Sequence, residues 1–123
     1  MLVIASFLLI FIGFVHSYLG EKYILIRLFK NDNLPKLFGS DHFTKRVLRF
    51  AWHLTTVSWW GFSAILYFLS NPSLNNRFEI LIVITVVFTI SGIVSFLFTR
   101  GKHLSWLFFF CIASISYFST IYK

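Results

Sequence analysis

Four long apolar runs occupy most of this 123-residue chain and limit what it can fold into. They cover residues 1–19, 50–69, 78–98 and 104–122, and none of them contains a proline. A transmembrane helix needs about 20 predominantly apolar residues, so each run is long enough to cross a lipid bilayer. We therefore predict an all-α polytopic membrane protein: four transmembrane helices in an antiparallel bundle, forming a single domain over residues 1–123.

The overall composition supports a membrane environment. Apolar residues make up 58% of the chain. Charged residues make up only 12%, whereas about a quarter of the residues of a soluble domain are usually charged. A soluble domain of this length needs more polar side chains than that to cover its surface. The composition therefore excludes a soluble enzyme, a disordered tail and a nucleic-acid-binding module. We interpret the net charge of +7 as a signal for orientation in the lipid bilayer and not as a signal for nucleic acid.

The first run differs from a cleaved signal peptide. It has no basic segment before its apolar residues, and no small-residue cleavage site follows it, so we predict a retained span. Within it, Ser6, Gly13 and Gly20 recur every seven residues and form a stripe of small residues. Such stripes mark helix contacts in membranes, and this one also directs His16 towards the other helices.

Helix-ending signals lie between the later runs. The Asn-Pro-Ser sequence at 71–73 ends the second helix, because proline cannot continue the hydrogen-bond ladder. Asn76 precedes Glu79 by three residues, which predicts a capping box at the start of the third helix. Gly101 stands where a left-handed C-terminal cap is expected, so the third and fourth helices should form a tight antiparallel hairpin.

The one long connection lies between the first and second runs. Residues 21–30 are apolar but too short to span a bilayer. They either lie in the membrane interface as an amphipathic helix or continue the first helix beyond the headgroups. Ser40 or Asp41 can cap the second helix, whose first turns (residues 42–49) then lie outside the hydrocarbon.

The basic residues gather on one side of the predicted topology. The 20–49 connection and the 99–103 turn share that side, whereas the other side has only Arg77 and Lys123. Because an excess of Lys and Arg marks cytoplasmic loops, we expect this side in the cytoplasm and both termini in the periplasm or exterior. The nine bases on the cytoplasmic side are Lys22, Arg27, Lys30, Lys36, Lys45, Arg46, Arg49, Arg100 and Lys102.

All four histidines also fall on the predicted cytoplasmic side. From the rise per residue of a helix, His16 and His53 lie at similar depths, about one turn inside the boundary. His103 lies at the boundary, and His42 lies just outside it. Ionisable residues within a membrane mark function by default. The candidate ligand-binding site built around this histidine cluster comprises His16, Glu21, Arg46, Arg49, His53 and His103.

Several ligands fit these side chains. The imidazoles of His16, His53 and His103 are candidate ligands for a transition metal such as Zn²⁺, Cu²⁺ or Fe²⁺, although no helix carries an HxxxH pair. His16 and His53 are also candidate axial ligands for haem b, with Arg46 and Arg49 paired to its propionates. The same arginines and histidines can hold the phosphate of an anionic lipid headgroup. In a purely structural role, the arginines extend to water and the histidines hydrogen-bond other helices.

Glu21 is the only acid near this cluster. Because bases are plentiful there, we expect an ion pair with Arg46 or Arg49, although Glu21 could also orient His16 or another imidazole. No catalytic residues are predicted, because the sequence lacks a carboxylate pair, a nucleophile elbow and a phosphate-binding glycine loop.

These features favour a non-enzymatic binding or accessory protein with a cytoplasmic-side polar site. The alternative is a haem- or metal-binding protein for redox chemistry or metal handling that uses His16 and His53, with His103 as a third ligand. A small transporter is a further alternative, although the outer halves of the helices offer only Ser and Thr as polar groups. The expected partners are the lipid bilayer and anionic headgroups, with no nucleic acid. The large lipid-facing surface also favours a homo-oligomer or a larger membrane complex.

Three strings in the first half of the chain carry a resemblance to other proteins. They are HSYLGE at 16–21, LRFAWHLT at 48–55 and WWG at 59–61. The strings resemble those of a group of small uncharacterised bacterial four-helix inner-membrane proteins. The resemblance implies a bacterial inner membrane and a four-helix architecture, and it brings no activity and no functional residues.

Overall fold

The computed structural model describes residues 2–71 and 76–121. Within these ranges the chain is helical apart from short connections and contains no β-strand, which confirms the all-α prediction. Residues 1, 72–75 and 122–123, and with them the predicted proline stop and the terminal lysine, lie outside the described residues. The elements are α1 (Leu2–Leu19), η1 (Gly20–Leu25), α2 (Ile26–Leu28), α3 (His42–Leu69), α4 (Arg77–Thr99) and α5 (Ser105–Ile121).

The first helix extends beyond its apolar run. α1, η1 and α2 are continuous, and η1 is π-helical, so the Ile26 N–H donates to the Glu21 carbonyl five residues back. Residues 21–28 therefore continue the first helix and do not form a separate interfacial helix. Two of the described helical segments, Leu2–Leu28 and Arg77–Thr99, are long and apolar enough to cross a membrane, and α5 is apolar but shorter.

The starts of α3 and α4 match the sequence, but their predicted capping bonds do not form. Asp41 stands at the N-cap of α3 without a side-chain capping bond, and its carboxylate lies 2.6 Å from Nζ of Lys45 instead. That hydrogen bond holds the pKa of Asp41 below its ordinary value. Asn76 likewise stands at the N-cap of α4 without a side-chain capping bond, which corrects the predicted capping box.

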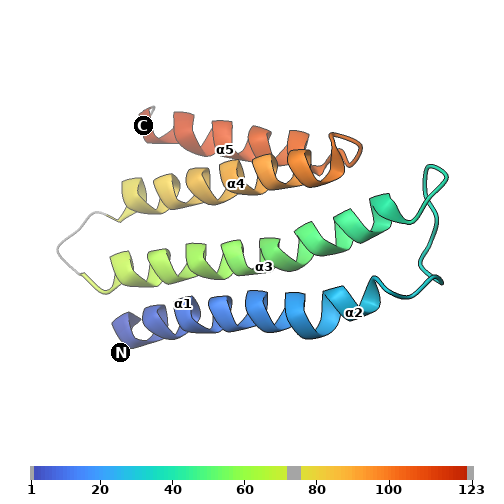
Figure 1. Cartoon of the computed structure of the whole chain (residues 1–123). Helices are drawn as coiled ribbons and strands as arrows, with labels where there is room; N and C mark the ends of the chain where they lie inside the picture. The colour runs from blue at the N-terminus through green and yellow to red at the C-terminus, as the bar shows by residue number, and fades with distance from the viewer. Residues whose placement is uncertain (1, 72–75, 122–123) are drawn as a thin grey trace.

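The long helices lie side by side in a single row, in the order α1, α3, α4, α5 (Figure 1). The chain reverses direction at each connection between them. α3 packs against α1 and α4, and α4 packs against α3 and α5, while the described residues of α1 make no helix contact with α4 or α5. A closed bundle would bring the first and last helices together. The arrangement is instead an open layer with two outer helices.

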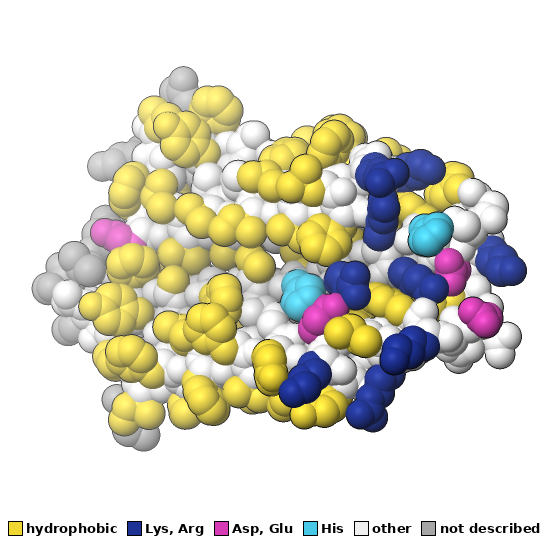
Figure 2. Space-filling model, viewed as in Figure 1, with side chains coloured by type: hydrophobic (Ala, Val, Ile, Leu, Met, Phe, Trp, Pro, Cys, Tyr) yellow, Lys and Arg dark blue, Asp and Glu magenta, His cyan; other side chains and the backbone are white. Residues whose placement is uncertain are grey.

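Most of the buried side chains in the contacts between the helices are small and polar, and larger side chains such as Trp52 and Trp60 pack over glycines there. Large apolar side chains cover the outside, where Phe7 and Phe11 are 64% and 66% exposed (Figure 2). This reverses the distribution of a soluble protein and matches the small-residue helix contacts of membrane proteins. Among the described residues, the buried polar ones are Ser6, Thr56, Ser63, Ser91, Ser95, Thr99 and Ser116, against three buried apolar ones, Leu25, Phe50 and Ala113.

The predicted stripe of small residues on α1 faces α3. Ser6, Gly13 and Gly20 are all buried, and the Ser6 hydroxyl donates to the Ser63 carbonyl at 2.8 Å. A methyl group on Gly13 would overlap the indole of Trp60, so glycine is needed for this close approach. The prediction that this stripe forms a helix contact is confirmed.

The turn between α4 and α5 reaches the left-handed region one residue earlier than predicted. Arg100 has φ 52° and ψ 41°, and Gly101 follows with φ 74°. The Gly101 N–H donates to the Phe96 carbonyl at 3.0 Å. The Arg100 N–H donates to the Leu97 carbonyl at 3.4 Å. This pair of bonds is the Schellman motif, whose left-handed position is usually glycine and here holds an arginine.

Candidate functional site

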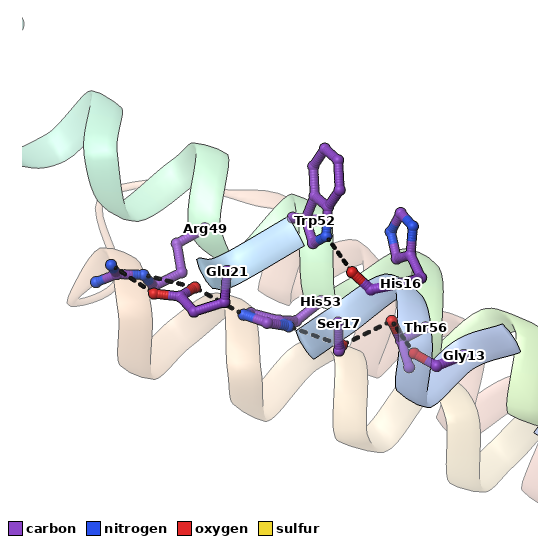
Figure 3. A network of polar contacts seen from close by, with 8 residues as sticks. All are labelled: Gly13, His16, Ser17, Glu21, Arg49, Trp52, His53 and Thr56. Atoms are coloured by element: carbon purple, nitrogen blue, oxygen red, sulfur yellow. Dashed lines mark hydrogen bonds and ion pairs between the residues drawn. The ribbon is translucent and has the colours of Figure 1, made fainter. Parts of the chain in front are cut away.

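A two-point ion pair joins η1 to α3 (Figure 3). Oε1 of Glu21 lies 2.8 Å from Nη2 of Arg49, and Nε of Arg49 donates to Oε2 at 3.2 Å. Two parallel contacts of this kind make the strongest geometry for an Arg–carboxylate pair. The Glu21 and Arg49 side chains are 31% and 38% exposed, so the pair keeps part of its hydration. The ion pair expected for Glu21 is therefore confirmed, with Arg49 and not Arg46 as the partner.

The position of Glu21 depends on the close approach of η1 to α3. A methyl group on Gly20 would overlap the Trp52 indole, so only glycine allows this contact. The Trp52 Nε1–H donates to the His16 carbonyl at 3.1 Å and ties α3 to the last turn of α1. The π-helical turn that follows widens the helix at Glu21, and such turns are frequent at functional sites.

His53 continues this network into the contact between α1 and α3. Its Nε2 lies 3.2 Å from Oε2 of Glu21, and its Nδ1 lies 2.9 Å from Oγ of Ser17. Ser17 Oγ lies 2.8 Å from Oγ1 of Thr56. The Thr56 hydroxyl then donates to the Gly13 carbonyl at 3.4 Å. Glu21, Arg49 and His53, which we call the charged network, thus connect to a buried chain of hydroxyl groups (Figure 3).

His53 links Glu21 to Ser17 through its two ring nitrogens, and the direction of the contact with Ser17 depends on which nitrogen carries a proton. The hydroxyl groups of Ser17 and Thr56 can each donate or accept in the contact between them, and the Thr56 hydroxyl also reaches the Gly13 carbonyl.

His16 belongs to the same helix pair but lies outside the charged network. Its ring stacks parallel to the indole of Trp52 with the centroids 4.5 Å apart, and it meets the Trp59 ring at 4.8 Å. Its Nε2 is buried without a hydrogen-bond partner among the described residues. Figure 3 shows the imidazole beside Trp52 and apart from the Glu21–His53 contact.

Arg46 and His103 are also separate from the charged network. Nδ1 of His103 lies 2.8 Å from Oγ of Ser105, and the His103 ring meets the ring of Phe50 edge-on at 5.6 Å. Arg46 lines a pocket beside the α4–α5 turn. The structure thus brings together three of the six predicted site residues: Glu21, Arg49 and His53.

The three imidazoles of the predicted metal site make separate contacts in the structure. His53 bonds to Glu21, His16 stacks between two tryptophans, and His103 bonds to Ser105. Within residues 2–71 and 76–121, no group of three or more His, Cys, Asp or Glu side chains is arranged to hold a metal ion. Arg49, expected beside a haem propionate, pairs with the protein's own carboxylate.

Sequence reasoning missed Ser17 and Trp52 as parts of this region. Ser17 precedes Glu21 by one turn, so the spacing i, i+4 places both side chains on one helix face. Thr56 follows His53 by three residues on α3 and shares its face in the same way. This spacing is the signal that pairs the two hydroxyls with the charged residues. For Trp52, no local pattern in the sequence indicates the bond to a backbone carbonyl.

Two of the strings that suggested a resemblance face each other in the structure. Residues 16–21 lie on α1 and η1, residues 48–55 lie on α3, and the hydrogen bonds of Glu21 and Trp52 join the two segments. No protein-family model, no curated protein and no solved structure matches this chain.

Proposed function

We propose that this chain is a small multi-pass membrane protein without catalytic activity, which binds an anionic lipid headgroup at its basic end. The observation that carries the proposal is the charged network, in which Arg49 and His53 both contact a single carboxylate, Glu21, at the end of the molecule where Lys and Arg side chains gather (Figure 2). All three side chains are about one-third exposed, so a ligand can reach them. The excess positive charge at the surface favours a negatively charged partner.

The distribution of side chains supports four spans in a membrane. The exposed surface of α1, α3, α4 and α5 is rich in large apolar residues, whereas Ser, Thr and Gly take most of the buried positions between these helices, some with a large side chain packed over them. In water this surface would favour aggregation, and in lipid it needs no cover. α3 and α5 then join the two longer apolar segments, Leu2–Leu28 and Arg77–Thr99, as spans.

The placement of charge supports a cytoplasmic orientation for the basic end. Lys and Arg side chains gather near α2, the start of α3 and the α4–α5 turn (Figure 2). The start of α1 and the end of α5 lie together at the opposite ends of the helices from these bases (Figure 1). By the positive-inside rule, the basic end faces the cytoplasm and both termini face the exterior of the inner membrane.

Cysteine labelling tests this orientation. In a Cys111→Ser background, Leu2→Cys provides a single thiol beside the N-terminus, and Lys36→Cys provides a single thiol at the basic end of the molecule. A membrane-impermeant maleimide should label Leu2→Cys in intact spheroplasts and Lys36→Cys only in inverted vesicles. The reverse pattern would contradict the proposed orientation.

Lipid binding is tested with the full chain purified in a neutral detergent. Native mass spectrometry with added phosphatidylglycerol should show saturable binding, and Arg49→Gln should weaken it by about tenfold. Lys22→Gln, which removes a neighbouring cation outside the charged network, is the matched control. Equal losses of lipid affinity in both variants would show that binding depends on net charge alone, and would contradict a specific site.

The visible spectrum of the same protein separates this function from the haem or metal alternative. Colourless protein without stoichiometric metal is expected after purification without chelators from iron- and zinc-replete cells. A Soret band, or bound metal that is lost in His16→Ala and His53→Ala, would support the alternative and contradict the proposal.

A further inference from the structure

A second polar pocket lies between the start of α3 and the α4–α5 turn. Its volume is about 280 Å³, close to the lower end of the range for small-molecule sites. No member of the charged network lines it. The polar residues that line it are Ser40, His42, Arg46, Thr99, Arg100 and Lys102.

The pocket collects positive charge from two distant parts of the sequence. Arg46 comes from α3, whereas Arg100 and Lys102 come from the turn after α4. None of the described residues that line the pocket is acidic. The neighbouring Asp41 is paired with Lys45 at 2.6 Å. Three like charges around one small volume repel each other, so an anion between them would be stabilising.

Neutral hydrogen-bond donors lie beside these cations. Ser40 and His42 bring the first turn of the 28-residue helix α3 to the pocket, and the Asp41 side chain does not cap that turn. N–H groups in the first turn of a helix have no carbonyl partner within the helix, so they can donate to a ligand at the positive end of the helix dipole. Thr99, which is 2% exposed, also lines the pocket, and its hydroxyl donates to the Ser95 carbonyl at 2.6 Å.

Both non-glycine residues with positive φ among the described residues line this pocket. Arg100 has φ 52° in the Schellman turn. Phe38 has φ 56° in a tight turn closed by two hydrogen bonds between Leu37 and Ser40. Backbone strain concentrates at ligand clamps and switch regions. A binding role for the pocket explains why an arginine occupies a position that glycine would fill more easily.

We propose that this pocket binds a phosphate group, supplied either by the headgroup of an anionic phospholipid or by a free phosphate ion. The pairing of guanidinium and ammonium groups with helix N–H groups is the recognised chemistry of phosphate sites. Phe38, which lines the pocket, is 70% exposed, and the centroid of its ring lies 4.9 Å from Nζ of Lys102. An exposed aromatic side chain beside cations fits the headgroup layer of a membrane.

The test uses the full chain in lipid nanodiscs and two probes. Inorganic phosphate is titrated by calorimetry into phosphatidylcholine nanodiscs, and short-chain phosphatidic acid is followed by native mass spectrometry in neutral detergent. Arg46→Gln and Arg100→Gly should each weaken binding of the responding probe by about tenfold. Because glycine suits the left-handed position, Arg100→Gly removes the cation without loosening the turn. Lys30→Gln, outside the pocket at the same end, should stay within about twofold.

The two probes identify the source of the phosphate. Saturable binding of inorganic phosphate with the predicted losses supports a site for the free ion. Binding of phosphatidic acid alone, with the same losses, supports a lipid headgroup site. No saturable binding of either probe, or an equal loss in Lys30→Gln, overturns the proposal.

Failure of this inference is distinguishable from failure of the proposed function. Arg49→Gln, which disrupts the charged network, should leave binding in the second pocket within about twofold. Arg46→Gln should in turn leave the stoichiometric phosphatidylglycerol site at the charged network occupied. A loss of pocket binding in Arg49→Gln equal to that in Arg46→Gln would overturn the existence of a separate second site.

Discussion

The Trp52 indole holds both the backbone and the side chain of His16. Its N–H donates to the His16 carbonyl at 3.1 Å, and its ring stacks on the imidazole with the centroids 4.5 Å apart. Trp60 makes a similar backbone contact two helical turns along α3, where its N–H donates to the Ile10 carbonyl at 3.3 Å. The α1–α3 contact is therefore set by tryptophans that reach the neighbouring backbone over glycine positions, Gly20 among them.

The Gly20→Ala variant should separate η1 from α3. Alanine favours a helix more than glycine does, but its methyl group would overlap the Trp52 indole. We expect a net loss of about 1–3 kcal/mol in the free energy of unfolding, as in other overpacked contacts. Thermal or denaturant unfolding in detergent measures it, with Ile24→Ala on the exposed side of η1 as the control. Unchanged stability of Gly20→Ala would show that Trp52 can move aside.

The coupling between Glu21 and Arg49 should be modest. The ion pair has good geometry, but about a third of each side chain is exposed, so water screens it. A double-mutant cycle of Glu21→Gln and Arg49→Gln should give a coupling energy of about 0.5–1 kcal/mol in unfolding experiments. A value above about 3 kcal/mol would indicate a pair removed from water and would contradict the partly hydrated site.

Acid should loosen the first turn of α3. The hydrogen bond from Lys45 lowers the pKa of Asp41 in the folded protein, so folding favours the carboxylate. This contribution is present above the ordinary pKa of 3.8 and is lost as the pH falls through the lowered folded value. Hydrogen exchange of the amides in residues 45–48, whose N–H groups bond back to the first turn, measures the change. Asp41→Asn should show the looser turn at every pH, and equal protection in both proteins would contradict the prediction.

The Arg100→Gly variant should be more stable than the natural chain. Glycine adopts the left-handed conformation of this turn without the steric cost of a side chain, so we expect a gain of about 1 kcal/mol. Gly101→Ala is the opposite case. It would place a methyl group 3.2 Å from the Phe96 ring at φ 74°, and should destabilise the turn. A loss of stability in Arg100→Gly would mean that the arginine side chain holds the turn together.

The helices themselves were predictable because each depends on a local run of residues. The runs at 1–19, 50–69, 78–98 and 104–122 all fall within or overlap described helices. The order of packing was less accessible, since an open row and a closed bundle place the same small residues at helix contacts. The sequence contains no local signal for the missing contact between α1 and the last two helices.

The sequence allowed the ion pair at the site to be predicted, but not which of the polar residues lie together. The scarcity of acids indicated an ion pair for Glu21, and the structure provides one with Arg49. The structure does not place His16 in the charged network, because its ring stacks on Trp52 and meets Trp59 at a tilt. The π-helical turn that begins at residue 20 changes the angular spacing between His16 and Glu21, and regular helical periodicity cannot anticipate it.

The open row also has a consequence for how the chain is made. Among the described residues, each long helix packs only against the long helix before or after it in the sequence. Contacts that are near in sequence form early and with a small loss of chain entropy. A newly synthesised helix can therefore dock on its predecessor as soon as it leaves the ribosome, and no closing step between the first and last helices has to await the end of translation.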